Sequence, residues 1–321
     1  MVQYNWMGHY AANMKQSDST YPFRRYDVEN KTGAGQVISC TVFPGVQTVY
    51  NDLYMYHCGK AVPKNDGIIE ISYCMDGRYE FEVSKQYFFY VSHGYLSIGT
   101  VGRKESGGSF PTKRYSGLTV FLDVAVFKEQ YCFVLQELGI NLEGILGAAM
   151  QQPRRCNLYG CPEIDVTFQM AIKAQKNGDA SLLKLKMLEL LLFLGKVDFD
   201  SLKDMPAYLN HAQVDLAKDV QRMLVSDLSV HLTLGQLSEK LHASQTIIKS
   251  VFKNVYGVSI RDYMKSYRLN EARRILGETE LPVAGVAAMV GYQNPGHFSA
   301  AFKEKYGILP GDYKKSVRFE Q

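Results

Sequence analysis

Apolar positions near the end of the chain recur at helical spacing in two short segments with a break between them. The first segment has apolar residues at i, i+3, i+4 and i+7, which is the spacing of one buried helix face. These residues are Val283, Val286, Ala287 and Val290. Gly291 follows directly and predicts the helix end, because glycine takes the left-handed backbone conformation at little cost.

The second segment begins with a capping signal. Asn294 is a favourable N-cap residue, and Pro295 suits the first helical position after it. Phe298, Ala301 and Phe302 then form a buried stripe. Helix, tight turn and helix in this order are typical of a motif that reads DNA bases. The opposite face supplies its predicted DNA contacts, which are Asn294, Gly296, His297, Ser299, Ala300 and Lys303.

The same pattern occurs fifty residues earlier in the chain. An internal repeat at constant spacing indicates two copies of one structural unit. The first members are Gly235, Phe252, Lys253, Tyr256, Gly257, Asp262, Tyr263 and Lys265, and they recur as Gly285, Phe302, Lys303, Tyr306, Gly307, Asp312, Tyr313 and Lys315. The sequence therefore predicts two similar helix-turn-helix units.

In the first unit, Thr233 is predicted to cap a helix that runs to Leu241, and Ser244 to cap the helix that reads DNA. A polar face on such a helix is also typical of plain solvent exposure, but the duplication favours DNA reading. A single helix over residues 267–276 is predicted to connect the units, with Arg268 facing a phosphate backbone. The predicted contacts here are Ser244, Gln245, Thr246, Lys249, Ser250, Lys253 and Arg268.

These motifs resemble the AraC/XylS family of bacterial transcription regulators, over about residues 213–318. The resemblance rests on Val286-A-A-M-V-G-Y-Q-N-P-G-H-F-S-A-A-F-K303 and on Gly307-I-L-P-G-D-Y313, and it includes a weaker similarity to the siderophore-sensing branch. Many members have arginine where this chain has Ser250 and Ala300, so arginine-to-guanine contacts are not expected at these positions. The small residues of the second unit indicate that it positions DNA more than it specifies the sequence.

Residues 36–126 have the alternation and turn signals of short strands. Asp76-Gly77 predicts a hairpin turn between strands 68–75 and 78–83. Further strands are predicted over 36–43, 49–57, 87–91, 95–101 and 117–123, and residues 1–35 are predicted to be a poorly anchored lead-in. This pattern is typical of a small barrel or jelly roll, and a β-sandwich fits it nearly as well. The resemblance implies a cupin-like β-barrel that binds an effector.

Helical periodicity returns over residues 127–194, with helices predicted at 127–138, 162–176 and 180–194. The last has an apolar stripe of Leu182, Leu185, Met187, Leu188 and Leu192, which suits either core packing or a homodimer contact. The resemblance implies dimerisation through these helices.

The predicted fold class is therefore α+β. It comprises a cupin-like β-barrel over residues 1–126, dimerisation helices over 127–194, a linker over 195–212 and an all-α DNA-binding domain over 213–321.

Charge and cysteine usage add to this interpretation. Residues 1–209 carry equal numbers of basic and acidic side chains, so the net charge of +4 falls entirely on residues 210–321. The six cysteines all precede residue 165 and form no CxxC pair. Together with the absence of a signal peptide and of a long apolar run, this predicts a cytoplasmic protein with free thiols and no membrane partner, which joins the nucleoid when bound to DNA.

No constellation of nucleophile and base is recognisable, so the chain is predicted not to be an enzyme and to use no cofactor. His57, Cys58, Cys74 and His93 have no diagnostic metal-binding spacing, and no metal is predicted. A cupin-type metal enzyme fused to a DNA-binding domain is the alternative class. It requires a metal triad that His57 and His93 alone do not supply.

Tyrosines concentrate in the predicted strands and suit an aromatic or amphipathic ligand. The predicted effector contacts are Tyr54, Tyr56, Tyr73, Arg78 and Tyr95. By analogy with the siderophore-sensing branch the effector is expected to be ring-bearing or a metal chelate, in a pocket of at least about 300 Å³; a filled barrel core is the alternative.

We therefore predict a homodimeric, effector-controlled regulator that binds double-stranded DNA, with RNA polymerase as a partner if it activates. In the alternative within this class, the barrel only dimerises.

Overall fold

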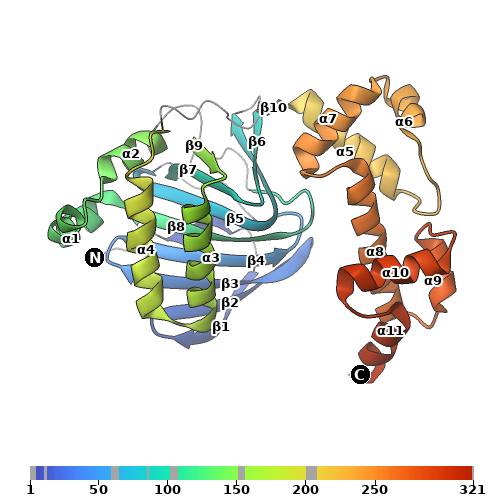
Figure 1. Cartoon of the computed structure of the whole chain (residues 1–321), viewed down its shortest axis with the longest axis horizontal. Coiled ribbons are helices and arrows are strands. Elements are labelled where there is room, and N and C mark those ends of the chain that lie inside the picture. Colours follow the sequence, from blue (N-terminus) through green and yellow to red (C-terminus); the bar gives the residue numbers. More distant parts are fainter. Residues whose placement is uncertain are drawn as a thin grey trace. The chain divides into compact units, whose positions relative to one another are not determined.

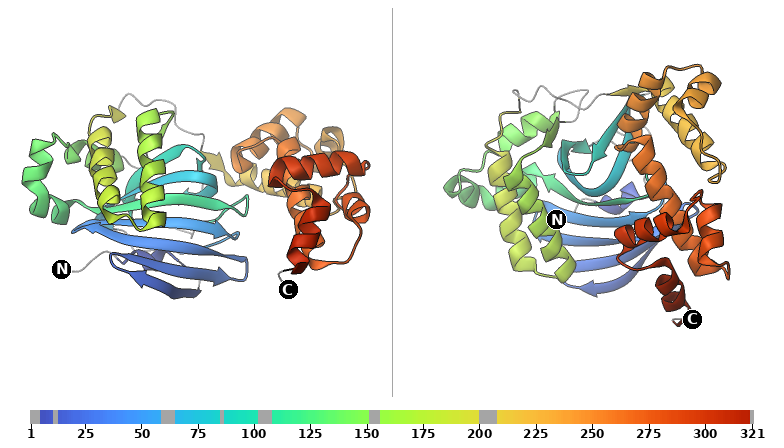
Figure 2. Two further views of the ribbon diagram at one scale, coloured as in Figure 1. Left: turned by 60° about the horizontal axis from the view of Figure 1, so that its bottom comes forward. Right: turned by 45° about the vertical axis from the view of Figure 1, so that its right-hand side comes forward.

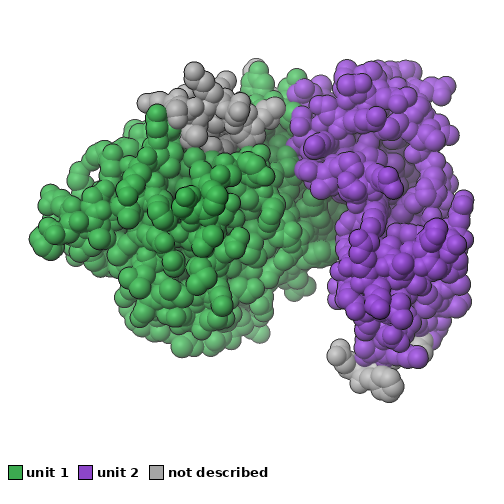
Figure 3. Space-filling model, viewed as in Figure 1, with its two compact units in different colours: residues 1–210 green, residues 211–321 purple. Residues whose placement is uncertain are grey.

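A computed structural model describes residues 5–10, 13–58, 65–84, 87–101, 108–150, 156–199 and 208–319. The chain divides into two compact units, residues 1–210 and 211–321 (Figure 3). The first unit contains strands and helices, and the second contains helices, as the predicted fold class requires.

The first unit is built on an antiparallel sheet. Its hydrogen-bonded order is β1 (Asn13–Thr20), β2 (Phe23–Asn30), β3 (Gly33–Phe43), β4 (Val46–Tyr54), β8 (Tyr115–Asp123), β5 (Asn65–Ser84), β6 (Tyr87–Ser92) and β10 (Leu209–Asn210). β7 (Tyr95–Val101) pairs with β5 and with β9 (Cys156–Tyr159). Within the described residues no pairing joins β1 to β10, so closure into a cupin-like barrel is not confirmed.

Helices cover one face of this sheet. α3 (Pro162–Asn177) and α4 (Ala180–Leu194) lie across the strands in Figure 1 and in both views of Figure 2. Tyr73 of β5 stacks on Phe168 of α3 with ring centroids 4.6 Å apart, and the Gln175 amide donates to the Ile38 carbonyl oxygen at 2.6 Å. α1 (Val124–Glu137) and α2 (Leu142–Met150) complete the apolar layer on this side.

A second apolar layer lies on the opposite face of the same strands. It includes Trp6, Leu53, Phe89, Tyr115 and Phe121, all buried. Both faces of the central strands are therefore covered, so these strands read as nearly continuous apolar runs.

The hairpin predicted at Asp76-Gly77 is wrong, because β5 continues through it as one strand. The pairing of β5 with β8 shifts register between Cys74 and Asp76, so a β-bulge lies directly before Gly77, which itself pairs with Tyr115. Gly77 has φ +82°, and a Cβ there would lie 1.9 Å from the Arg114 carbonyl oxygen. Glycine is required where the two backbones approach so closely. A glycine after an aspartate is also the sequence signal of a turn, so the two cases look alike in the sequence.

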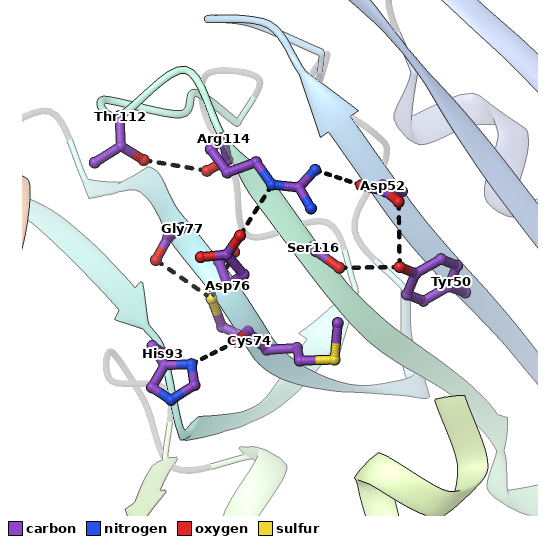
Figure 4. A network of polar contacts seen from close by, with 10 residues as sticks. Tyr50, Asp52, Cys74, Asp76, Gly77, His93, Thr112, Arg114 and Ser116 are labelled. Carbon is purple, nitrogen blue, oxygen red and sulfur yellow. Dashed lines mark hydrogen bonds and ion pairs between the residues drawn. The ribbon is translucent and has the colours of Figure 1, made fainter. Parts of the chain in front are cut away.

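A polar network holds the strands together beside this bulge (Figure 4). The Arg114 guanidinium, directly before β8, donates to Asp76 at 2.9 Å and also to Asp52, so it joins β5 to β4. The Tyr50 hydroxyl lies 3.1 Å from Ser116 Oγ and donates to Asp52 at 3.4 Å.

The predicted lead-in over residues 1–35 is also wrong, because β1, β2 and the start of β3 lie there. β1 is an edge strand that contributes backbone hydrogen bonds and almost no buried side chains. Its side chains are mostly polar, so its sequence lacks the apolar alternation from which strands are predicted. The predicted helices 127–138, 162–176 and 180–194 correspond to α1, α3 and α4, whereas α2 and β9 were not predicted.

The second unit contains α5 (His211–Val225), α6 (Leu234–Leu241), α7 (Gln245–Tyr256), α8 (Ile260–Glu278), α9 (Val283–Met289), α10 (Pro295–Tyr306) and α11 (Pro310–Phe319). α6–α7 and α9–α10 are the two predicted helix-turn-helix units, and α8 connects them (Figure 1). α8 is longer than predicted and contributes to both cores. Its Tyr263 ring lies 5.3 Å from that of Phe252, and its Leu269 and Ile275 belong to one apolar cluster with Phe302.

Candidate nucleic-acid interface

The helix α7 presents the polar face that the sequence predicts. Its Ser244 cap accepts from the Ile247 backbone N–H at 3.3 Å, so the helix starts where expected. Ile248, Val251 and Phe252 are buried on the inner side. The predicted contacts are all exposed, namely Ser244, Gln245, Thr246, Lys249, Ser250 and Lys253.

Ile247 is an exposed apolar residue on α7 that the sequence analysis left out. It is 51% exposed although it lies next to the buried Ile248. An apolar side chain in the first turn of such a helix suits contact with a thymine methyl group. It was missed because apolar residues were assigned to the core by default.

The helix α10 starts at the predicted cap. The Asn294 side-chain oxygen accepts from the Gly296 and His297 backbone N–H groups at 2.8 and 3.2 Å. Its amide oxygen is thus used within the protein. Ser299 is half-buried, and its hydroxyl donates to the Pro295 carbonyl oxygen at 2.9 Å. The other predicted contacts on this helix, Gly296, His297, Ala300 and Lys303, are exposed.

Both helices border one groove within the second unit, with a volume of about 1130 Å³. Lys249 lies on its wall from α7, and Asn294 and His297 lie there from α10. Arg261 and Lys265 of α8 also line it and were not predicted. Basic side chains along a groove between two such helices suit a phosphate backbone.

Arg268, a predicted phosphate contact, also lines the groove and in addition has a partner within the protein. Its Nη1 atom lies 3.1 and 3.3 Å from the two ring nitrogens of His231. His231 Nε2 in turn lies 2.8 Å from the Gly291 carbonyl oxygen. Burial lowers the pKa of Arg268, in keeping with a structural position. We call Arg268, His231 and Gly291 the clasp; it ties the loop before α6 to the turn after α9.

Further polar contacts fix α10 against α8. Lys305 donates to Ser266 Oγ at 2.6 Å and to Asn270 Oδ1 at 2.7 Å. Burial, assisted by the nearby charge of Arg273, lowers the pKa of Lys305 to about 8. The clasp and these bonds set the position of α10 relative to the rest of the unit.

The predicted effector residues lie in different surroundings within the first unit. Tyr73 faces the helical layer, and Tyr95 stacks on Tyr159 at 4.5 Å. Arg78 is buried, with its guanidinium 4.9 Å from the Tyr90 ring. Two of them share a partner, since the Lys113 ammonium lies 5.2 Å from the Tyr54 ring and 5.5 Å from the Tyr56 ring.

A different set of residues lines a cavity on the sheet face opposite α3 and α4. Its volume is about 60 Å³, well below the 300 Å³ or so of a pocket for a drug-sized ligand. A ring-bearing chelate does not fit this cavity. None of the five predicted effector residues is among its lining residues, which include Tyr10, Asn51, Glu70, Ser72, Tyr79, Phe110, Tyr115, Thr119 and Phe121.

Among the described residues, no group of three or more histidines, cysteines or acidic side chains is arranged to hold a metal ion. In the same part of the chain, no helix combines the length and the apolar character needed to cross a bilayer.

Comparison with known proteins places the similarity in the second unit. Residues 237–316 match the family model described as a helix-turn-helix domain. The uncharacterized HTH-type transcriptional regulator YtdP of Bacillus subtilis (strain 168) is 32% identical over 115 residues, which cover 33% of this chain and 15% of that protein. The transcriptional activator NphR of Rhodococcus sp is 33% identical over 106 residues, or 33% and 31% of the two chains.

Further matches have the same extent. The uncharacterized HTH-type transcriptional regulator YdiP of Escherichia coli (strain K12) is 35% identical over 103 residues, or 32% of this chain and 34% of that protein. The C-terminal domain of AraT, a response regulator from Geobacillus stearothermophilus, is 28% identical, covers 32% of this chain and 84% of that one, and has a TM-score of 0.30. The chain thus spans about a third or less of the length of these curated relatives.

The two capped helix pairs, their connecting helix and the family match all fall within residues 211–321. This part of the chain is an AraC/XylS-type double helix-turn-helix domain.

Proposed function

We propose that the protein is a transcription regulator that binds double-stranded DNA in a sequence-specific way. The observation that carries this proposal is the pair of exposed helix faces, on α7 and α10, that border one basic groove. Helices joined in this way suit successive major-groove segments of one face of the duplex. The names of the relatives, which include a transcriptional activator, agree with this function. No catalytic role is part of the proposal.

The two helices have different roles in this proposal. α7 supplies hydrogen-bonding side chains such as Gln245 and Lys249, which suit adenine and guanine edges respectively. On α10, Gly296 and Ala300 have no polar side chain, and they allow the backbone to approach DNA closely. α7 therefore specifies the sequence, and α10 mainly positions the domain.

Lys249→Ala tests the reading face directly. Losing a cation that contacts base edges or phosphates should lower affinity for a selected operator about tenfold or more, because such contacts are worth roughly 1–3 kcal/mol. Fluorescence anisotropy at fixed salt concentration measures this effect. Lys15→Ala, at an exposed lysine of β1, is the matched control. Equal losses in both variants would show that α7 does not read DNA.

We further propose that the protein is a homodimer that joins through the outer faces of α3 and α4. Val166, Met170 and Leu185 are exposed apolar residues there, and Leu185 is 63% exposed. Leu182, Leu188 and Leu192 are half-buried along the same side of α4. Exposed apolar surface of this kind is typical of interaction sites. RNA polymerase is a further partner if the regulator activates transcription.

Leu185→Glu is expected to shift the protein to monomers, because the interface would then bury an unpaired carboxylate. Sedimentation velocity across a concentration series measures the change. Phe133→Glu introduces the same charge at an exposed apolar residue of α1, outside the proposed interface, and should leave the oligomeric state unchanged. A dimer that persists in the Leu185 variant contradicts this interface.

Control by a small molecule bound in the first unit completes the proposed function. A ligand that binds the native state alone raises the unfolding temperature, which a metabolite screen by thermal shift detects. In the alternative function, the first unit only dimerises and no ligand changes operator binding. The cavity on the sheet favours control by a ligand over this alternative.

A further inference from the structure

Polar side chains from three central strands converge on the cavity of the first unit. Glu70 and Ser72 come from β5, Asn51 from β4 and Thr119 from β8, and all four are buried. Ser72 Oγ donates to Glu70 Oε1 at 3.3 Å and lies 3.2 Å from Thr119 Oγ1. The Tyr10 hydroxyl donates to Asn51 Oδ1. Polar groups of this kind are costly inside an apolar core, so their convergence on a cavity indicates a binding site.

The rest of the cavity wall is largely aromatic. The rings of Phe110 and Tyr115 stack with centroids 5.1 Å apart, and Tyr79 packs 5.5 Å from Tyr115. Phe121 lines another side and lies 5.2 Å from the His9 ring. Aromatic faces carry negative electrostatic potential and attract cations that come within about 6 Å.

The charge of the site selects the kind of ligand. Glu70 is the acidic residue on the cavity wall and is only 4% exposed. A buried carboxylate is stabilised by a cation held against it and is destabilised by a second anion. Burial raises the pKa of Tyr10 and of Tyr115, so both hydroxyls remain neutral and add no competing charge. His9 also lies on this wall.

We propose that this cavity binds a small organic cation, an amine or a methylated ammonium ion, with its charged nitrogen at Glu70 and its carbon atoms against the aromatic wall. The volume of about 60 Å³ restricts the ligand to a few non-hydrogen atoms. This inference gives the chemical class of the effector and rests on the proposed function only for its effect on DNA binding.

The chain has a single tryptophan, Trp6, which reports on this cavity. It is buried, and its ring lies 5.8 Å from that of Tyr10, a cavity residue. The full chain is titrated with methylammonium chloride and with tetramethylammonium chloride while tryptophan fluorescence is recorded. Sodium chloride at equal ionic strength and tert-butanol, a neutral molecule of similar shape, are the controls. We expect a saturable change with at least one organic cation and with neither control.

Glu70→Gln removes the charge with little change in shape, and it should weaken cation binding about tenfold or more, because the attraction between the carboxylate and the positive charge of the ligand is lost. Phe121→Leu removes an aromatic face and should weaken it too, which keeps the test decisive if one variant fails to fold. Equal binding by Glu70→Gln, equal binding of tert-butanol, or no saturable change with either cation would overturn the assignment.

Operator affinity is measured separately with and without the bound cation. Saturable binding that leaves operator affinity unchanged supports the site and contradicts effector control. Failure of the protein to bind any operator contradicts the proposed function, and the fluorescence titration still decides on the cation site.

Discussion

Replacing Gly291 by alanine should destabilise the second helix-turn-helix unit by about 3 kcal/mol or more. Gly291 has φ +84°, where a side chain is strained. An added Cβ would also lie 2.2 Å from the Leu228 carbonyl oxygen and 3.0 Å from Cζ of Arg268. The substitution therefore opens the clasp in addition to straining the turn, and α10 loses its fixed position.

Amide hydrogen exchange in α9 and α10 of the full chain measures this effect, since it reports local opening free energies. Gly307→Ala is the matched control, because Gly307 ends α10 with φ +75° and its Cβ would meet nothing within 4 Å. It should lower stability only through the strain of alanine in a left-handed backbone conformation, by about 1 kcal/mol. Equal losses in the two variants would show that the clasp contributes nothing.

The second large effect is expected at the duplicated core phenylalanines. Phe252 and Phe302 hold equivalent positions in the two units and are completely buried. The Phe302 ring packs 4.7 Å from that of Tyr306, and the Phe252 ring packs 4.5 Å from that of Tyr256. Changing either one to alanine should cost about 3–5 kcal/mol, the usual cost of truncating a core aromatic residue.

The loss of stability should be confined to the helix-turn-helix unit that carries the substitution. Phe302→Ala should raise exchange in α9 and α10 and leave α6 and α7 protected, and Phe252→Ala should do the reverse. Lys303→Ala, beside Phe302 but exposed, should change neither. If either phenylalanine variant opened both helix-turn-helix units to the same extent, the two would unfold cooperatively as one structure joined through α8.

The fold of the second compact unit, residues 211–321, was predictable because its sequence signals are local. The caps at Ser244 and Asn294 bond to backbone groups two or three residues away, and the structure confirms both. The fixed repeat offset did not depend on any long-range contact. The contact between Arg268 and His231 was not predictable for the opposite reason, since the two residues lie 37 positions apart in sequence.

The first unit was less predictable because its strands are buried on both faces. Alternation along β5 does not tell which side carries a cavity, and Tyr73 turned out to pack against α3 whereas Glu70 lines the opposite face. A usable signal was present, because Glu70 and Ser72 interrupt an otherwise apolar run at alternate positions. At Gly77 the local sequence fits a turn, and only the position of Arg114 in the folded chain shows that the strand continues there.

Hydroxyl-radical footprinting of the full chain on a selected operator tests the central claim most directly. Two helix-turn-helix units joined by α8 should protect two backbone segments about one helical turn, roughly 34 Å, apart on one face of the duplex. Changing bases under the α7 segment should reduce affinity more than changing those under the α10 segment. Protection of one segment only, or binding that does not depend on operator sequence, would contradict the account.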